Sequence, residues 1–451
     1  MDGTAHRLET ARQAAARCML GSLLLGLSFP VWAQTFTPVT AAAWAQAHSP
    51  ELAAIKAQAD ATGQGVALAR AANRPSVRLG ESYALSNDPL AGLTQKLETR
   101  SATNADFAPS ILNHPGTTHL NTLGLSATLP LYMGGSRRDR LQAARYARRA
   151  ARAQLQRAAQ DIVAQALTAY ATVEWARTEV HIARQALALD QRHVQTTARL
   201  RREGQIVASD HLTAVVAATR ARMALAQAQA ALETARASFL LALDLPPTTS
   251  LQLARMPLPA VPATPDRLIQ RALSRRPDLT ALQAQARGAD VEVAAARARR
   301  RPVIAVSAAN DWYDNYPGLA QRSWTVMASI SGTLYDGGAA SARTAQALDE
   351  AQAVRHQRTA LTAAVAEQVA DAWRNLQLAQ AQRARARDAV RDAGRAAHLV
   401  RIRYGQGRTP LFDVLGSEQS LTQARDAVAS ATYDWRRAGI ALRRAEGLGA
   451  P

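Results

Sequence analysis

The chain has 451 residues, and its 54 Lys and Arg residues outnumber 35 Asp and Glu residues to give a formal net charge of +19. A single cysteine excludes a disulfide framework and a cysteine-rich zinc site. The basic side chains are spread among alanines rather than gathered in one block, which favours solvated helix faces and anionic surfaces over nucleic-acid binding.

The first 33 residues are typical of a secretory signal peptide. Basic residues precede the apolar stretch CMLGSLLLGLSF, and small residues two apart lead up to Gln34. This apolar stretch is too short to span a bilayer as a helix. We therefore expect cleavage after Ala33, which removes Cys18 and leaves an exported protein without a thiol. A short buried helix is the alternative.

The rest of the sequence contains an internal repeat, the first pattern to seek in a long chain. Three sets of residues recur in the same order: Pro50 and Pro75 match Pro277 and Pro302 at an offset of 227, Tyr132 matches Tyr335 at 203, and Gly204 and Asp210 match Gly407 and Asp413, also at 203. The fall from 227 to 203 gives the first copy 24 additional residues. They lie in the polar, proline-containing segment 86–121, which predicts a long loop.

Six prolines between residues 244 and 268 exclude a continuous helix between the two copies. The sequence therefore predicts four parts. They are the signal peptide over residues 1–33, a first structural repeat over 34–243, a proline-rich linker over 244–264 and a second structural repeat over 265–451.

Each repeat begins with a helical segment and continues with two strands. The helical segments, 41–73 and 265–300, are rich in Ala, Leu, Gln and Arg and end at an X-Pro step. The strands alternate polar and apolar residues and cover 77–85 and 122–131 in the first copy, and 303–313 and 324–334 in the second. Strands of about ten residues with one apolar face suit a tilted crossing of an outer membrane. A soluble β-hairpin is the alternative.

A Tyr-X-Gly-Gly junction follows each pair of strands. Tyrosine is typical of a membrane interface, and the two glycines give the backbone freedom to turn from strand into helix. The junction residues are Tyr132, Gly134 and Gly135 in the first copy and Tyr335, Gly337 and Gly338 in the second.

A long helical hairpin completes each repeat. Residues 136–203 and 339–404 contain no proline and follow a 3.6-residue period, so each helix can extend roughly 100 Å. After a Gly-containing turn, a second helix returns over 210–243 and 413–446. The predicted fold is mainly α, with long antiparallel helical hairpins and four β-strands per chain. Four strands cannot close a membrane β-barrel, so several chains must share one.

Together, the repeated order of elements, the Tyr-X-Gly-Gly junctions and the turn with the sequence YGQGRTPLFDVL resemble the TolC family of outer-membrane efflux proteins, over nearly all of residues 38–447. The resemblance implies a homotrimer in the outer membrane, with a twelve-stranded barrel embedded in lipid and a helical tunnel in the periplasm. It also implies a channel of a tripartite efflux or type I secretion system. Its partners are a periplasmic adaptor protein and an inner-membrane pump, and it needs no cofactor.

The resemblance also implies where the periplasmic entrance lies. The family closes it with a tyrosine, a basic residue and acids, and the turns between the long helices meet the adaptor. Carried over, the entrance residues are Tyr404, Arg408, Thr409 and Asp413 in the second copy and Ser209 and Asp210 in the first, and the adaptor-contact residues are Gly204, Gly407 and Leu411. Thr409 stands at the usual basic position and Gly416 replaces a second acid, so the sequence supports one acidic ring but not the salt-bridge lock.

Rival functions fit less well. Nine histidines are dispersed and no Gly-rich phosphate loop follows a strand, so we expect no enzyme activity and no metal site. A cap at the start of the returning helix is the alternative role for Asp210 and Asp413. An exported coiled-coil scaffold or adaptor without a barrel would account for the helices and the export, but not for four matched strands.

Overall fold

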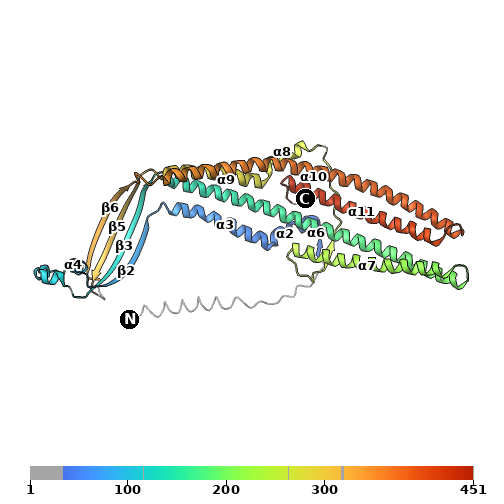
Figure 1. The fold of residues 1–451 in the computed structure, drawn as a ribbon, viewed down its shortest axis with the longest axis horizontal. Helices are drawn as coiled ribbons and strands as arrows, with labels where there is room; N and C mark the ends of the chain where they lie inside the picture. The colour runs from blue at the N-terminus through green and yellow to red at the C-terminus, as the bar shows by residue number, and fades with distance from the viewer. Residues whose placement is uncertain (1–33, 115, 263, 316–318, 450–451) are drawn as a thin grey trace, which may run out of the picture.

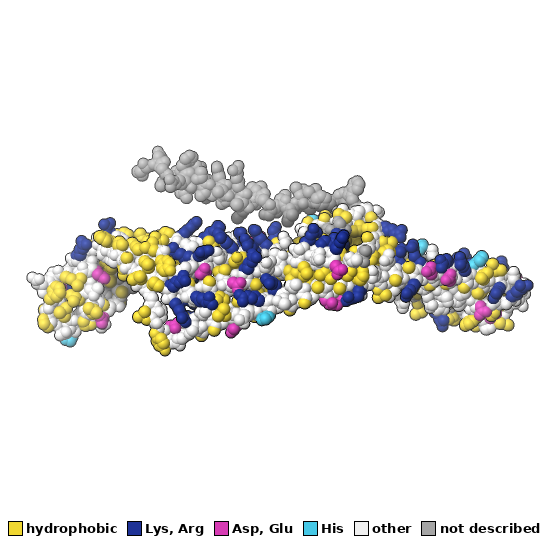
Figure 2. All heavy atoms as spheres, turned by 90° about the horizontal axis from the view of Figure 1, so that it is seen from above, with side chains coloured by type: hydrophobic (Ala, Val, Ile, Leu, Met, Phe, Trp, Pro, Cys, Tyr) yellow, Lys and Arg dark blue, Asp and Glu magenta, His cyan; other side chains and the backbone are white. Residues whose placement is uncertain are grey.

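The structure is a computed structural model that describes residues 34–114, 116–262, 264–315 and 319–449. The predicted signal peptide lies outside the described residues. The molecule is elongated, with a β-sheet towards one end and two helical hairpins reaching the other (Figure 1). Figure 2 shows basic side chains along much of the helical part, with fewer acids among them.

The two long hairpins match the prediction to within about two residues at each end. The first consists of α6 (Ser136–Arg202) and α7 (Ala208–Ala242), and the second of α10 (Ala339–Gly405) and α11 (Leu411–Ala445). The long arm of each has 67 residues, about 100 Å at the α-helical rise.

The two shorter helical segments, each predicted to be continuous, are both broken. The first forms α2 (Pro38–His48) and α3 (Pro50–Ala71), and the second forms α8 (Asp266–Arg275) and α9 (Pro277–Ala298). The break comes directly before a proline in both copies, because proline lacks the N–H that would continue the helix and disfavours helical geometry in the preceding residue. Ser49 then caps α3 by accepting a hydrogen bond from the Leu52 amide.

A four-stranded antiparallel sheet confirms the four predicted strands. It consists of β2 (Ser76–Ser86), β3 (Thr118–Met133), β5 (Val303–Asp314) and β6 (Gln321–Ser331), in the order β2-β3-β5-β6. Apolar side chains on it are strongly exposed, with Trp324 at 70% and Ile330 at 71%. The apolar face is not continuous, since Glu81 lies on it and accepts a hydrogen bond from the Asn121 amide at 3.2 Å.

The helices follow the same lateral order as the strands. Helix α3 packs on α6, α6 on α9 and α9 on α10, while further along α7 packs on α6, α6 on α11 and α11 on α10. One edge of the protomer is therefore formed by β2, α3 and α7, and the other by β6 and α10. Within the described chain, neither β2 nor β6 has a strand on its outer side.

The glycine junctions adopt the predicted geometry. Gly134 and Gly135 have φ of 64° and 93°, and Gly337 and Gly338 have 65° and 90°, values that favour glycine. The strand before the second junction is shorter than predicted, however. It ends at Ser331, so Tyr335 lies beyond it.

The two copies differ here because of their neighbouring strands. Strand β3 continues to Met133 by pairing with Val303, the first residue of β5. On the other side of β5, Val303 already pairs with Ser331 of β6. Residues 332–335 have no further strand to pair with, because Pro302 precedes β5.

The segment predicted to be a long loop is instead partly helical. It contains α4 (Pro89–Glu98), the 3-10 helix η1 (Asn104–Phe107) and α5 (Pro109–Asn113). Proline at the first helical position favours the start of α4 and α5. An ion pair between Lys96 and Asp106 joins α4 to η1 within the segment. A 2.6 Å hydrogen bond from Gln95 to Asn315 holds the segment against the end of the sheet.

The linker crosses the helical layer and covers its core. A parallel pair that the sequence did not predict joins β1 (Gln34–Phe36) to β4 (Leu251–Leu253). Below it, the buried Tyr170 hydroxyl donates to the Phe36 carbonyl at 2.9 Å. Arg177 of α6 donates to the Leu251 carbonyl of the linker at 3.1 Å. Farther along, the Trp373 indole of α10 donates to the Pro262 carbonyl at 2.9 Å, so the linker contacts both hairpins. Among the described residues, no helix combines the length and apolarity of a membrane span.

Candidate functional site

The end of the molecule away from the sheet is formed by the turns of the two hairpins (Figure 1). Each turn depends on a glycine with positive φ, 68° at Gly204 and 69° at Gly407. Helix α7 follows the first turn after the N-cap residue Val207, and α11 follows the second after the N-cap residue Pro410. The equivalent positions thus have the same backbone geometry in both copies.

The two predicted acids lie in the first turns of these helices, at the third helical position. Neither is the N-cap residue, so the alternative that Asp210 and Asp413 cap the returning helices is wrong. A carboxylate at this position still interacts favourably with the positive end of the helix dipole. Asp413 is exposed, and its Oδ2 accepts a hydrogen bond from the Thr409 hydroxyl at 2.5 Å.

Tyr404 lies between the hairpins. It packs against a small buried cluster of Ala214, Leu411 and Val414, which comes from both α7 and α11. Burial raises the pKa of Tyr404, and the negative charge of Asp210 raises it further. The structure therefore brings Tyr404 close to Asp210, and separately joins Thr409 to Asp413.

The remaining predicted residues are placed differently. Ser209 and Arg408 are exposed, and Arg408 forms no ion pair with any described residue. Leu411, predicted to contact an adaptor, is only 4% exposed and belongs to the buried cluster, so it cannot lie on a docking surface. The reason is helical phase, because Leu411 and Val414 share the inward face of α11, whereas Phe412 points outward and is 74% exposed.

A buried ion-pair cluster lies just behind these turns, and the sequence did not predict it. Glu418 of α11 is 4% exposed, and its Oε2 lies 2.6 Å from Nε2 of His193 on α6. Its Oε1 accepts from the Arg401 guanidinium of α10 at 2.8 Å. Burial alone raises the pKa of Glu418, but the hydrogen bonds from His193 and Arg401 outweigh it and hold that pKa below its usual value. The Glu418 cluster thus ties the two hairpins together near their tips.

One sequence signal could have indicated this cluster. Glu418 is seven residues after Leu411 and four after Val414, which places its carboxylate on the inward face of α11. A charge on an inward helix face needs a partner. Its partners could not be identified, because His193 and Arg401 come from other helices.

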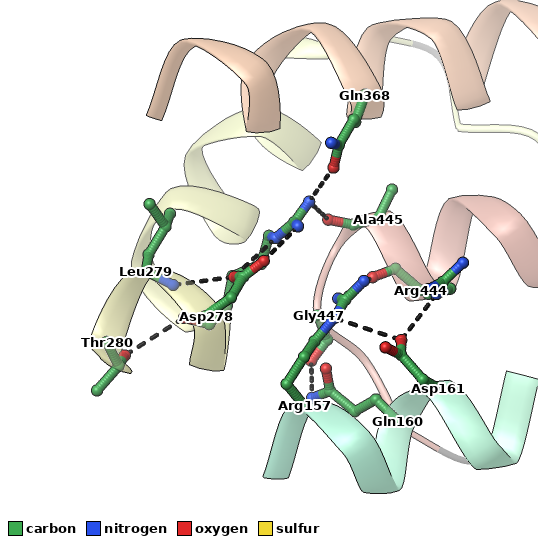
Figure 3. A network of polar contacts seen from close by, with 11 residues as sticks. Arg157, Gln160, Asp161, Asp278, Leu279, Thr280, Gln368, Arg444, Ala445 and Gly447 are labelled. Carbon is green, nitrogen blue, oxygen red and sulfur yellow. Dashed lines mark hydrogen bonds and ion pairs between the residues drawn. The ribbon is translucent and has the colours of Figure 1, made fainter. Parts of the chain in front are cut away.

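A second polar network joins the same helices near the other end of α11 (Figure 3). The Asp161 carboxylate of α6 accepts from Arg444 at 2.7 Å and pairs with Arg157 at 3.3 Å. Gln160 donates to the Gly447 carbonyl at 2.7 Å, and buried Arg276 connects Asp278 to α10 through Gln368. The two hairpins are therefore fastened at both ends of the contact between α6 and α11.

Between these two networks, acids face each other across α6 and α11. Burial, and then the charge of Asp426, raise the pKa of Glu179 to about 7. Burial also raises the pKa of Asp426. When both carboxylates are ionised, their repulsion destabilises the middle of the contact between α6 and α11. Protonation of Glu179 relieves that repulsion.

We expect this pair to make stability fall as pH rises. Between pH 4.5 and about 7 the folded state holds a proton on Glu179 that the unfolded state has lost, so unfolding becomes easier with rising pH. The Glu179→Gln variant should flatten this fall in melting temperature of the detergent-solubilised protein. Glu233→Gln, at an exposed acid of α7, is the control and should leave the slope unchanged. An unchanged slope in Glu179→Gln would contradict the assignment.

Comparisons with known proteins match this arrangement over most of its length. The family model described as outer membrane efflux protein matches residues 43–243 and 268–448. Outer membrane efflux protein BepC of Brucella suis biovar 1 is 24% identical over 401 residues, which cover 86% of this chain and 87% of BepC. Protein CyaE of Bordetella pertussis is 31% identical over 274 residues, 56% of this chain and 55% of CyaE. The solved outer-membrane channel OprN superposes with a TM-score of 0.76 at 22% identity, covering 91% of this chain and 90% of OprN, and supports the same fold.

Proposed function

The chain belongs to the outer membrane efflux protein family, and we propose that three copies of it form the channel through which a tripartite efflux or type I secretion system exports its cargo. Its place is the outer membrane, with the helical hairpins in the periplasm. As a transport protein it moves cargo without chemical change.

The observation that carries this proposal is the open four-stranded sheet with exposed apolar side chains. An open sheet edge in lipid leaves backbone groups unsatisfied, so β2 and β6 each need a partner strand. The strand order matches the helix order, so β6 and α10 of one copy can meet β2, α3 and α7 of the next. Such a head-to-tail contact closes into a ring, and three copies supply twelve strands. A scaffold without a barrel leaves Trp324 and Ile330 in water.

The tips of the hairpins are the proposed docking surface for a periplasmic adaptor, which in turn connects to an inner-membrane pump. The turns at Gly204 and Gly407 are exposed, and helix ends carry backbone groups without intrahelical partners. Phe412 and Val207 add exposed apolar side chains beside these turns. Phe412 replaces Leu411 in this proposal.

In a ring of three copies, the tips surround one axis and form the entrance. Three Asp413 carboxylates would gather around that axis and repel one another, so a multivalent cation should bind there. The Thr409 hydroxyl, which donates to Asp413, orients each carboxylate in its turn. The Glu418 cluster lies behind these turns and joins the two hairpins.

Conductance of the purified protein in a lipid bilayer tests this function. We expect a channel that hexamminecobalt blocks from the periplasmic side, weakly and in a salt-sensitive manner because exposed charges are screened. Asp413→Asn should weaken the block by about tenfold or more. Asp388→Asn removes an exposed acid away from the tips and should leave the block intact.

Three results would contradict the proposal in different ways. Extraction of the protein in buffer without detergent, with no conductance, would favour the exported scaffold. A block that survives Asp413→Asn would place the cation site elsewhere. Loss of the oligomer in Asp413→Asn would make Asp413 a structural residue.

A further inference from the structure

A cavity lined by arginines lies between the two hairpins and the linker. None of its lining residues belongs to the hairpin turns or to the β-sheet. The cavity measures about 330 Å³ and opens between α6, α10, α11 and the linker. Its basic lining consists of Arg255, Arg383, Arg387, Arg425 and Arg436.

The cavity has far more positive charge than its own acid can balance. Glu174 is the carboxylate in the lining, and it is already occupied, because it pairs with Arg436 at 3.1 Å and accepts from the Met256 amide at 3.0 Å. Arg255 and Arg387 form no ion pair or side-chain hydrogen bond with any described residue. Four of the five guanidinium groups thus lack a carboxylate in the described chain.

Two of the arginines are held in place and partly dehydrated. Arg436 is 7% exposed, donates to the Met256 carbonyl at 2.5 Å and keeps a buried Nε without a hydrogen-bond partner among the described residues. Arg383 lies 5.1 Å from the ring centre of Trp435 and donates from Nε to the Thr432 hydroxyl at 3.0 Å. Burial lowers the pKa of Arg383, and the nearby charges of Arg387, Arg436 and Arg255 lower it further. These like charges favour binding of an anion.

The lining residues and the volume of the cavity indicate which class of anion it can bind. Guanidinium groups bind carboxylates and phosphates through paired hydrogen bonds. A volume of about 330 Å³ lies at the lower end of the range for small-molecule sites. It is larger than the volume that a single carboxylate or phosphate group occupies. One wall is formed by the stacked rings of Trp175 and Tyr433, whose centres are 5.4 Å apart.

We propose that this cavity binds a small anion with at least two carboxylate or phosphate groups. The lining comes from α6 of one hairpin, α10 and α11 of the other, and the linker, so the bound anion fastens the hairpins together between the Figure 3 network and the Glu418 cluster. The site faces the linker side of the helical layer, where Arg436 meets Met256. A carboxylate of a neighbouring copy is the rival occupant, because α10 forms one edge of the protomer.

Calorimetric titration of the detergent-solubilised oligomer with citrate and with pyrophosphate tests the proposal. Acetate at equal ionic strength is the reference for non-specific screening. We expect saturable binding of citrate, pyrophosphate or both, and the stronger of the two assigns the carboxylate or the phosphate class. The double variant Arg255→Gln/Arg387→Gln should bind about a hundredfold more weakly, about tenfold for each charge-assisted contact removed.

A control with the same loss of charge separates a site from general attraction. Arg385 and Arg395 are exposed on α10 and do not line the cavity, so Arg385→Gln/Arg395→Gln should bind like the unmodified chain. Without anion, the cavity variant should melt at the same temperature or higher, since it relieves repulsion. Equal weakening in both variants, or no binding beyond that of acetate, would overturn the proposal. So would dissociation of the oligomer by the cavity variant, which would assign the arginines to a neighbouring copy.

Discussion

Replacing Gly134 with alanine will destabilise the protein far more than the same change at Gly337, although the two residues occupy equivalent positions. Both have φ near 65°, so a side chain costs about 1–2 kcal/mol of backbone strain at either position. A Cβ at Gly134 would also lie 2.6 Å from the Ala298 carbonyl oxygen and 2.9 Å from Cβ of Arg301. At Gly337 a Cβ would meet nothing within 4 Å.

The difference follows from the position of each junction in the protomer. Gly134 lies in the interior, where the end of α9 and the start of β5 close over it, and its carbonyl accepts from Arg301 at 3.3 Å. Gly337 lies at the edge, beyond the end of β6. Overpacking at Gly134 should add about 1–3 kcal/mol to the backbone strain. Urea unfolding of the two variants measures the difference, and equal losses would contradict it by showing that a neighbouring copy closes around Gly337.

Periodicity in the sequence predicted the helices and strands, because these elements depend mainly on residues that are close together along the chain. The long helices carry a 3.6-residue period over 67 residues without proline, so their ends were placed within about two residues. The strands carry a period of two, and the glycines at 134 and 135 indicated the strand-to-helix turn. The repeat made each of these predictions twice, so each copy supported the other.

The parts that the sequence did not predict depend on contacts between distant residues or on single local breaks. The β1–β4 pair has three residues in each strand and joins Thr35 to Gln252, so neither strand has enough length to show a period. Pro50 and Pro277 each fall inside a continuous helical pattern, and only their effect on the preceding residue ends the helix. The entrance residues were identified by position in the turns, which placed Leu411 on the wrong side of α11.

The Glu418 cluster and the Figure 3 network together suggest how the hairpins move. The Figure 3 network joins four helices at the sheet side of the α6–α11 contact, whereas the Glu418 cluster joins three near the tips. Between them, Glu179 and Asp426 repel one another. We therefore expect the hairpins to separate at the tips when the Glu418 cluster breaks, with the Figure 3 network as the pivot.

Glu418→Gln will open the channel. The substitution keeps the side chain's size but removes the charge that holds His193 at 2.6 Å and Arg401 at 2.8 Å. A hydrogen bond to a charged group contributes about 1.5–3 kcal/mol, so the ratio of open to closed channels should rise about ten- to hundredfold. Single-channel conductance in a bilayer measures this ratio. Arg401→Gln should have a smaller effect, because the Arg401 side chain is half exposed and its ion pair is more strongly screened.

Two measurements show whether the Glu418 cluster acts as a latch at the tips or whether its loss weakens the whole α6–α11 contact. They are the pH dependence of channel opening and a control substitution in the Figure 3 network. Because the folded-state pKa of Glu418 is lowered, its stabilisation is complete above the ordinary value of 4.5 and is lost as pH falls through the folded-state pKa. The unmodified channel should therefore stay closed at neutral pH and open in acid, whereas Glu418→Gln should be open at both. Asp161→Asn removes the carboxylate that Arg444 binds at the pivot, so it should lower the melting temperature without raising conductance. If Asp161→Asn opens the channel as much as Glu418→Gln, then closure depends on the whole contact between α6 and α11 and not on a latch at the tips.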